Sequence, residues 1–259
     1  MFPIKLLDSL PPELASINNP PKSLFAVGRE ALLGERKIAV IGTRRPSAYT
    51  KTHTYRLAQA IAKAGGVVVS GAAMGVDAIA HQGAGERTIA VMGNSLDIFY
   101  PKINKTLIQT IYNNSLALSE YETGYEARPY SFVLRNRIVV GLSEAVVITQ
   151  ADMNSGSMTS AKLAMEMGKP IYVLPHRLGE SEGTNRLLCE GLATAVYDID
   201  AFMETLGFES KADEKDEILA YLRQNPGYNA AVEKFGERIY EYELDGRILV
   251  RNNLITVVG

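Results

Sequence analysis

The sequence predicts an α/β fold built on a mostly parallel, doubly wound sheet, followed by a small C-terminal module with a winged-helix-like order of elements. Short apolar runs alternate with helical segments from residue 37 to residue 175, at the spacing of βαβ units. A polar, charged segment at 207–216 separates this pattern from three short helical segments and a hairpin. The 259 residues suffice for one medium domain and one small one.

The N-terminal segment is rich in proline and weakly patterned. The pairs Pro11–Pro12 and Pro20–Pro21 restrict the backbone to extended conformations. We therefore expect residues 1–35 to form an arm that lies on the domain, with regular structure beginning at Lys37.

Six apolar runs predict the strands of the sheet. The first, KIAVIGT, is typical of a strand buried on both faces of a parallel sheet. The six runs cover residues 37–43, 67–70, 88–92, 115–120, 145–149 and 171–175. The helical segments between them cover about 50–64, 73–84, 102–113, 130–142 and 157–168. This alternation places helices on both faces of the sheet.

The sequence predicts that the C-terminal part forms a separate module. We place the sheet domain at 36–208 and the module at 209–259, with the polar segment as the linker. Three short helical segments precede RILVRNNLITVV, which predicts a hairpin that turns at Asn252–Asn253. A plain helical cap is the alternative to a winged-helix-like module.

Composition excludes several classes of protein. The 27 basic and 29 acidic residues give a net charge of −2, which argues against a polycation but not against a local basic groove. One cysteine, Cys189, excludes a disulfide within the chain and a multi-cysteine zinc site. The N-terminus has no secretory pattern, and no apolar run is long enough to span a membrane. We therefore expect a cytoplasmic protein with no membrane partner.

The loops that follow the predicted strands are rich in glycine and hydroxyl groups, and Arg44 and Arg45 come directly after the first strand. Ligands bind beyond the carboxyl ends of parallel strands. Glycine lets the backbone approach a ligand, and helix N-terminal amides with Ser or Thr hydroxyls bind phosphate. Tight turns without a ligand are the alternative, and Asp77 fits equally well as a charge at a helix N-terminus. The candidate residues are Gly42, Thr43, Arg44, Arg45, Ser70, Gly71, Gly75, Asp77, Ser155, Gly156 and Ser157.

Several motifs are absent from the sequence. No GxGxxG follows the first strand and no acidic residue is placed for a ribose, which disfavours NAD. There is no GxxxxGK[ST] and no GxSxG, and the loops hold no obvious pair of carboxylates for acid–base catalysis. We expect no cofactor and no metal, and an edge that holds phosphates.

The segment 128–137 combines three arginines with two aromatic residues. On a helix, Phe132 and Arg135 lie three residues apart, with Arg128 one turn back on the same side. Basic residues that follow a backbone and an aromatic ring that stacks on a base are the parts of a single-strand binder. The alternative is that Tyr130 and Phe132 are core residues and that the arginines pair with acids such as Glu144.

The ordered set of these segments resembles the DNA-processing protein A family (DprA, also called Smf). The matching stretches span about 37–194 and include KIAVIGTRRPS, VVVSGAAMGVDAIAHQGA, TIAVMGNSLDIFYP, LALSEYETG, FVLRNRIVVGLSEAVVITQADMNSGSMTSAKLAMEMGKPIYVLP and EGTNRLLCEGLA. The resemblance implies an extended Rossmann-like domain that binds single-stranded DNA and forms a homodimer. It further implies protection of incoming DNA and loading of RecA recombinase in natural transformation, with no catalytic activity.

The resemblance also assigns site residues. Arg44 sits in the turn that holds phosphate, and Phe132 would stack on a base. Two positions depart from the family pattern, at Gln150 to Asp152 and at His176, and neither is expected to contact the ligand. Further positions that match the family motifs are Asn136 and Arg137 of the predicted helix and Gly183, Thr184 and Asn185 of a later loop.

Two other functions are compatible with parts of the sequence. The first is a nucleotide phosphoribohydrolase of the lysine-decarboxylase-like Rossmann group, whose PGGxGTxxE motif sits at the same strand end. This chain has Asn154-Ser155-Gly156 there, without the PGG or the glutamate. The second is a transcription factor that uses the C-terminal module, which is disfavoured because residues 211–259 hold 7 basic and 9 acidic residues.

Overall fold

The computed structural model describes residues 2–208, 217–222, 224, 226–244, 247–251 and 253–257. The chain divides into two compact units, Met1–Ser210 and Lys211–Gly259. Most of the expected linker, residues 209–216, lies outside the described residues. No helix within the described part of the chain is long and apolar enough to cross a lipid bilayer.

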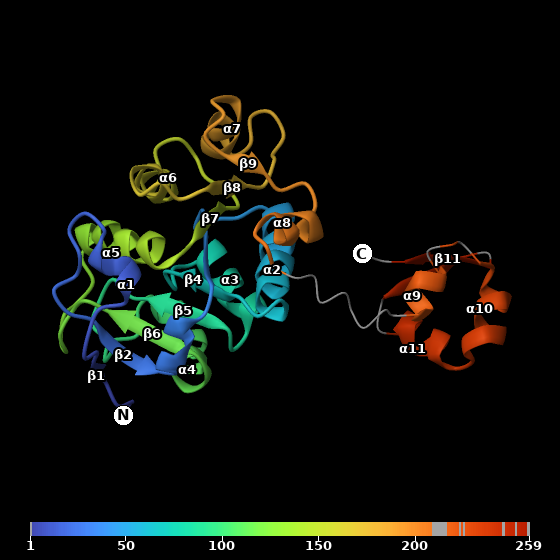
Figure 1. The fold of residues 1–259 in the computed structure, drawn as a ribbon, viewed down its shortest axis with the longest axis horizontal. Coiled ribbons are helices and arrows are strands. Elements are labelled where there is room, and N and C mark those ends of the chain that lie inside the picture. Colours follow the sequence, from blue (N-terminus) through green and yellow to red (C-terminus); the bar gives the residue numbers. More distant parts are fainter. Residues whose placement is uncertain are drawn as a thin grey trace. The chain divides into compact units, whose positions relative to one another are not determined.

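A nine-stranded sheet forms the centre of the first unit (Figure 1). Its strands in chain order are β1 (Lys5–Leu6), β2 (Phe25–Gly28), β3 (Lys37–Ile41), β4 (Val67–Ser70), β5 (Thr88–Val91), β6 (Leu116–Ser119), β7 (Ala145–Ile148), β8 (Ile171–Val173) and β9 (Thr194–Ala195). Their order in the sheet is β1-β2-β6-β5-β4-β3-β7-β8-β9. The seven strands from β6 to β9 are parallel, whereas β1 and β2 are antiparallel additions. The predicted α/β fold class is therefore confirmed.

Helices cover both faces of this sheet. They are α1 (Pro12–Ala15), η1 (Glu30–Gly34), α2 (Ala48–Lys63), α3 (Val76–Ala84), η2 (Lys102–Asn104), α4 (Lys105–Asn114), α5 (Pro129–Leu142), α6 (Gly156–Glu166), α7 (Glu182–Cys189) and α8 (Ile199–Thr205). One face packs against α1, α5, α6 and α7, and the opposite face packs against α2, α3 and α8, with α4 beside β5 and β6 (Figure 1). Residues 38–41 of β3 alternate between these two cores, which is why all four are apolar.

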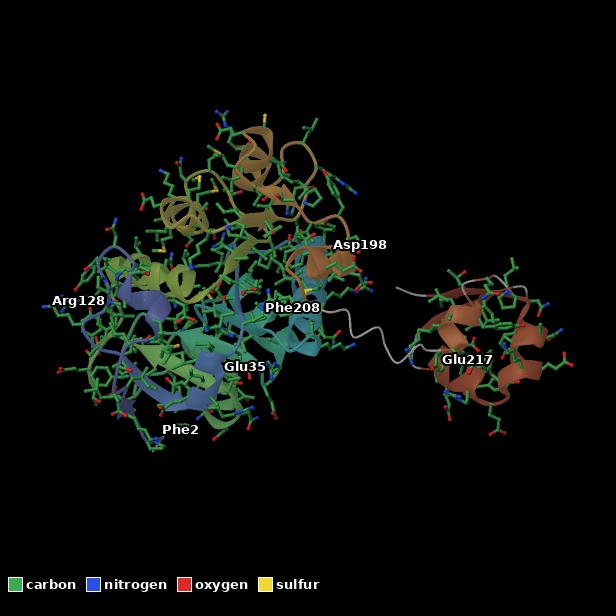
Figure 2. All side chains as sticks on the ribbon, in the orientation of Figure 1. Phe2, Glu35, Arg128, Asp198, Phe208 and Glu217 are labelled. Atoms are coloured by element: carbon green, nitrogen blue, oxygen red, sulfur yellow. The ribbon has the colours of Figure 1, made fainter. Side chains whose placement is uncertain are left out.

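The N-terminal segment corrects the sequence-based expectation. Regular structure begins well before Lys37, because β2 pairs with β6 and β1 pairs with β2. Leu24 and Leu32 are buried in the same core cluster as α5. Phe2 packs edge-on against Phe99 and Tyr112, with ring centroids 6.3 and 5.1 Å away (Figure 2). β2 pairs with β6, about 90 residues further along the chain, so no local pattern indicates this pairing.

The second unit has the expected order of elements. Helices α9 (Glu217–Leu222), α10 (Tyr228–Phe235) and α11 (Arg238–Leu244) precede a hairpin of β10 (Ile248–Arg251) and β11 (Leu254–Val257). The pairing of Arg251 with Leu254 confirms the predicted hairpin. Asn253 has a φ of 64°, a left-handed conformation that asparagine tolerates. Residue 252 lies outside the described residues.

Replacing Leu24 by alanine tests whether the N-terminal segment is part of the core. Leu24 is 1% exposed, so its truncation should lower the free energy of unfolding by about 2–5 kcal/mol. Urea unfolding of the full chain measures this. Leu178→Ala, at a side chain that is 99% exposed, is the control and should change little. Equal unfolding midpoints for the two variants would show that the segment is a loosely attached arm.

Candidate functional site

A groove of about 750 Å³ runs along the carboxyl ends of the central strands. The loops after β3, β4 and β7 and the start of α5 and α6 all contribute to its walls. The structure brings together in this groove most of the residues that the sequence singled out: Gly42, Thr43, Arg44, Arg45, Gly71, Asp77, Phe132, Arg135, Asn136, Ser155, Gly156 and Ser157. It adds Tyr100, Gln150, Asp152 and Ser160 to the lining.

Two exposed arginines supply the accessible positive charge of the groove. Arg44 and Arg45 follow β3 directly, and neither forms an ion pair within the described residues. Arg44 also lies over the Phe132 ring, with its Cζ 5.9 Å from the ring centroid. These guanidinium groups are free to bind an anionic ligand, and arginine forms strong charge-assisted hydrogen bonds with phosphate.

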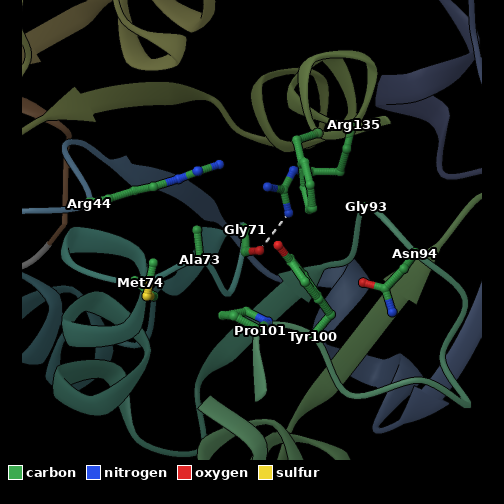
Figure 3. A pocket seen from close by; sticks show the side chains of 10 residues that line it. Arg44, Gly71, Ala73, Met74, Gly93, Asn94, Tyr100, Pro101 and Arg135 are labelled. Carbon is green, nitrogen blue, oxygen red and sulfur yellow. Dashed lines mark hydrogen bonds between the residues drawn. The ribbon is translucent and has the colours of Figure 1, made fainter. Parts of the chain in front are cut away.

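Arg135 has a different role, because it is only 4% exposed. Its Nη1 donates to the carbonyl oxygen of Gly71 at 2.6 Å (Figure 3) and to that of Val91. These two hydrogen bonds tie α5 to the ends of β4 and β5. A Cβ on Gly71 would lie 2.4 Å from the Arg135 guanidinium, so a larger residue here would displace that group. Burial lowers the pKa of Arg135.

The loop after β4 is held by side chains rather than left open to a ligand. The Asp77 carboxylate accepts hydrogen bonds from the amides of Gly71, at 3.1 Å, and Ala73, at 3.4 Å. The Nε2 of His81 accepts from the amide of Ala72 at 3.2 Å. These three amides are therefore not available to phosphate, contrary to the expectation for a glycine-rich loop. Burial raises the pKa of Asp77, against the opposing effect of the Arg135 charge and the two amides.

Helix α6 presents its N-terminus to the groove. Ser155 caps it, since its Oγ accepts from the amide of Met158 at 3.3 Å and donates to the Asp152 carbonyl at 2.6 Å. The amides of Gly156 and Ser157 are the first of the helix and have no acceptor within it. This end of the groove therefore offers backbone donors to an anion.

A small pocket opens beside Phe132. Tyr100 stacks on Phe132 with ring centroids 5.4 Å apart and an interplanar angle of 28°. Asn94 lines the same pocket and is 1% exposed. Its Nδ2 donates to the carbonyls of Ser95 and Ile98, so its Oδ1 must face away from them, and Oδ1 has no hydrogen-bond partner. Figure 3 shows this oxygen turned toward Tyr100.

Sequence reasoning missed both Tyr100 and Asn94 as site residues. Asn94 had a usable signal, because it lies in the loop that directly follows β5. Tyr100 had none, since it lies nine residues beyond that strand and reaches the groove through the path of a long loop.

Arg137 and Arg128 do not line the groove. Arg137 is buried, pairs with Glu120 at 2.6 Å and donates to the Asn19 carbonyl at 2.7 Å. The alternative of arginines paired with acids thus holds for Arg137, although Glu144 pairs with Arg36. Arg128 begins α5 and points outward, with its Cζ 5.9 Å from the Tyr125 ring (Figure 2).

The remaining candidate residues also lie outside the lining of the groove. The Ser70 hydroxyl is buried and donates to the Val40 carbonyl. Gly75 has a φ of 82°, and a Cβ there would lie 2.5 Å from the Thr43 carbonyl, so glycine at this position lets the loops after β3 and β4 approach each other. At the start of α7, Gly183 donates to the Ala151 carbonyl, Thr184 bonds to Ser181, and Asn185 donates to the carbonyls of residues 176, 177 and 180.

The pH dependence of stability tests the neutral state of His81. Burial, together with the Arg135 charge, lowers the pKa of His81 to about 3. The unfolded state binds a proton below about pH 6.5, and the folded state does not, so the free energy of unfolding should fall as the pH drops from about 6.5 toward 3. The His81 side chain should change the free energy of unfolding by at most about 1.4 kcal/mol per pH unit.

Urea unfolding between pH 7 and pH 4.5 measures this effect. The variant His81→Gln cannot titrate, so its stability should fall less steeply over the same range. Because Asp77 and the other acids remain in both proteins, the difference in slope isolates the histidine. Parallel curves for the two proteins would contradict a buried neutral His81.

Comparisons with known proteins show the family of this chain. Residues 4–207 match the family model of DNA recombination-mediator protein A. The DNA processing protein DprA of Streptococcus pneumoniae is 39% identical over 204 residues, which cover 76% of this chain and 72% of that protein. The DprA of Bacillus subtilis is 36% identical over 199 residues, which cover 74% of this chain and 67% of that protein.

Solved structures give the same result. The DNA processing protein A of Helicobacter pylori, whose structure concerns its single-stranded DNA binding mode, superimposes with a TM-score of 0.78 and 48% identity over 79% of this chain and 96% of that chain. The structure of DprA from Streptococcus pneumoniae gives a TM-score of 0.72 and 37% identity over 77% of this chain and 72% of that one. The chain therefore belongs to the DNA recombination-mediator protein A family, the DprA/Smf family that its sequence resembles.

Proposed function

We propose that the groove binds single-stranded DNA. The observation that carries this proposal is the combination, in one groove, of two unpaired exposed arginines with the stacked pair Tyr100 and Phe132. Arginines that follow a phosphate backbone and aromatic rings that stack on bases are the two components of single-strand binding. The similar protein from Helicobacter pylori binds single-stranded DNA, which supports the proposal.

Each wall of the groove would make a different contact. Arg44, Arg45 and the N-terminus of α6 would bind phosphates, while Phe132 would stack on a base. Stacking and phosphate contacts read little sequence, so we expect weak sequence preference.

We infer that the bound strand is incoming DNA in natural transformation, which the protein protects and on which it loads RecA recombinase. The family name, recombination mediator, and the relatives named DNA processing proteins support this role. The same inference includes a homodimer that acts in the cytoplasm. We propose that the first unit, which includes the first 35 residues as well as 36–208, binds DNA, and that the second unit serves for docking or dimerisation.

We propose that the groove binds without catalysis. Its two lining carboxylates are Asp77, which is engaged with backbone amides, and Asp152. The rival nucleotide phosphoribohydrolase needs a glutamate after its PGG turn, and the corresponding stretch here has Ser155 and Gly156 without one. Release of free base from nucleoside monophosphates would support the rival enzyme and contradict the binding function.

The variant Arg44→Ala tests the groove. We expect its affinity for single-stranded oligonucleotides to fall about tenfold or more, equally for all sequences, because a charge-assisted phosphate contact is lost. The slope of log Kobs against log salt should become shallower by about 0.7 for the one phosphate no longer neutralised. Fluorescence anisotropy at several salt concentrations measures both quantities.

A matched control is available at the opposite edge of the sheet. Arg29 is also exposed and follows β2 next to the start of β6, at the amino ends of the parallel strands, where it pairs with Glu86 at 3.4 Å. Arg29→Ala removes the same charge and should bind as the wild type does. If folded Arg44→Ala binds oligonucleotides as tightly as wild type, the groove is not the DNA site.

Handover to RecA needs a separate test. Single-stranded DNA is coated with a single-strand binding protein, and the rate at which RecA forms filaments is followed by its ATP hydrolysis. Wild-type protein should shorten the lag, and Arg44→Ala should not, since it cannot hold the strand. A wild-type protein that binds the strand but leaves the lag unchanged would refute the RecA role and leave DNA binding intact.

A further inference from the structure

Three aromatic rings form a cluster beside the groove. Tyr49, in the first turn of α2, lies with its ring centroid 4.5 Å from that of His53 and 5.4 Å from that of His176. The ring of His176 meets Tyr49 at 81°, edge to face. Tyr49 nevertheless remains 42% exposed, so the cluster presents an aromatic surface to solvent. The groove described above does not include any of these three rings.

Hydrogen bonds join this cluster to the wall of the groove. The Nε2 of His176 donates to the carbonyl oxygen of Thr149 at 2.8 Å, and the next residue, Gln150, lines the groove. The Oε1 of Gln150 accepts from the Ser47 amide at 3.0 Å and from the Thr50 hydroxyl at 2.8 Å, on either side of Tyr49 in the sequence. Tyr49 therefore lies beside the wall of the groove that Gln150 forms.

The surroundings of the cluster carry positive charge. Arg45 lines the groove four residues before Tyr49, Arg177 follows His176, and the charge of Arg56 acts on His53. All three arginines are exposed, and none forms an ion pair within the described residues. Glu180 lies in the same loop as Arg177 and is the nearest acid along that loop.

We propose that Tyr49, His53 and His176 form a second binding surface for single-stranded nucleic acid, on which the bases of the segment leaving the groove stack. This proposal rests on the proposed function of the groove and extends its path. An exposed tyrosine ring among unpaired arginines matches an unpaired strand, because a base stacks on the ring and phosphates contact the cations. Burial and the charge of Arg56 lower the pKa of His53, which keeps that ring neutral for stacking.

Binding of oligonucleotides of two lengths tests the proposal. One oligonucleotide of about 6 nucleotides occupies the groove alone, and one of about 20 reaches beyond it. We expect Tyr49→Ala to weaken the longer one about fivefold or more and to leave the shorter one unchanged, since a single base–aromatic stack is lost. Tyr49→Phe keeps the ring and should bind both as wild type does.

Tyr55 provides a matched control on the same helix, because it is 43% exposed and lies outside the cluster. Tyr55→Ala should bind both lengths as wild type does. Circular dichroism verifies that each variant is folded. Wild-type affinity of Tyr49→Ala for the longer oligonucleotide would overturn this surface and leave the groove intact, whereas failure of wild type to bind either length would overturn the groove itself.

Discussion

The edge of the sheet depends on one buried cation. Arg135 projects from α5 into the space where β4 and β5 end, and its guanidinium satisfies the carbonyls of Gly71 and Val91. Buried carbonyls at strand ends need such partners, because leaving them unpaired is costly. The nearby Asp77 carboxylate balances the charge, which makes the ionised arginine tolerable in a buried site. This tie fixes the distance between α5, which carries Phe132, and the loops that carry the phosphate-binding candidates.

The residues around Arg135 divide into buried side chains that hold the backbone and exposed groups that are able to bind a ligand. Asp77, His81 and Arg135 are buried and engaged with the backbone of residues 71–73, so this loop keeps its shape without a ligand. Arg44, Arg45 and the start of α6 are left with donors that face the groove. Because the loop is already rigid and the donors are exposed, less conformational entropy is lost when a ligand binds. The close approach of Phe132 to Gly93, where a Cβ would lie 2.7 Å from Cδ1, belongs to the same arrangement.

The candidate site was predictable where it lies next to a strand end. Arg44 and Gly71 follow apolar runs directly, Ser155 lies in the loop after another run, and the rule that parallel strands end at one edge brings the three together. Burial was not predictable for the arginines of α5. Arg135 and Arg137 are two residues apart in one motif, and nothing in the sequence distinguishes them. In the structure Arg135 donates to carbonyls of the sheet, whereas Arg137 pairs with Glu120. Which partner each one meets depends on elements far away in the chain.

The sequence by itself determined the six buried parallel strands predicted from its apolar runs, the helices between them and the order of elements in the C-terminal unit. Local periodicity and composition, which depend only on residues close together in the sequence, predict these features. Only the tertiary structure decided that β1 and β2 extend the sheet, that Tyr100 reaches Phe132, and that the amides of residues 71–73 are occupied. Each of these depends on a contact between segments distant in sequence, and such contacts arise from packing that no local pattern encodes.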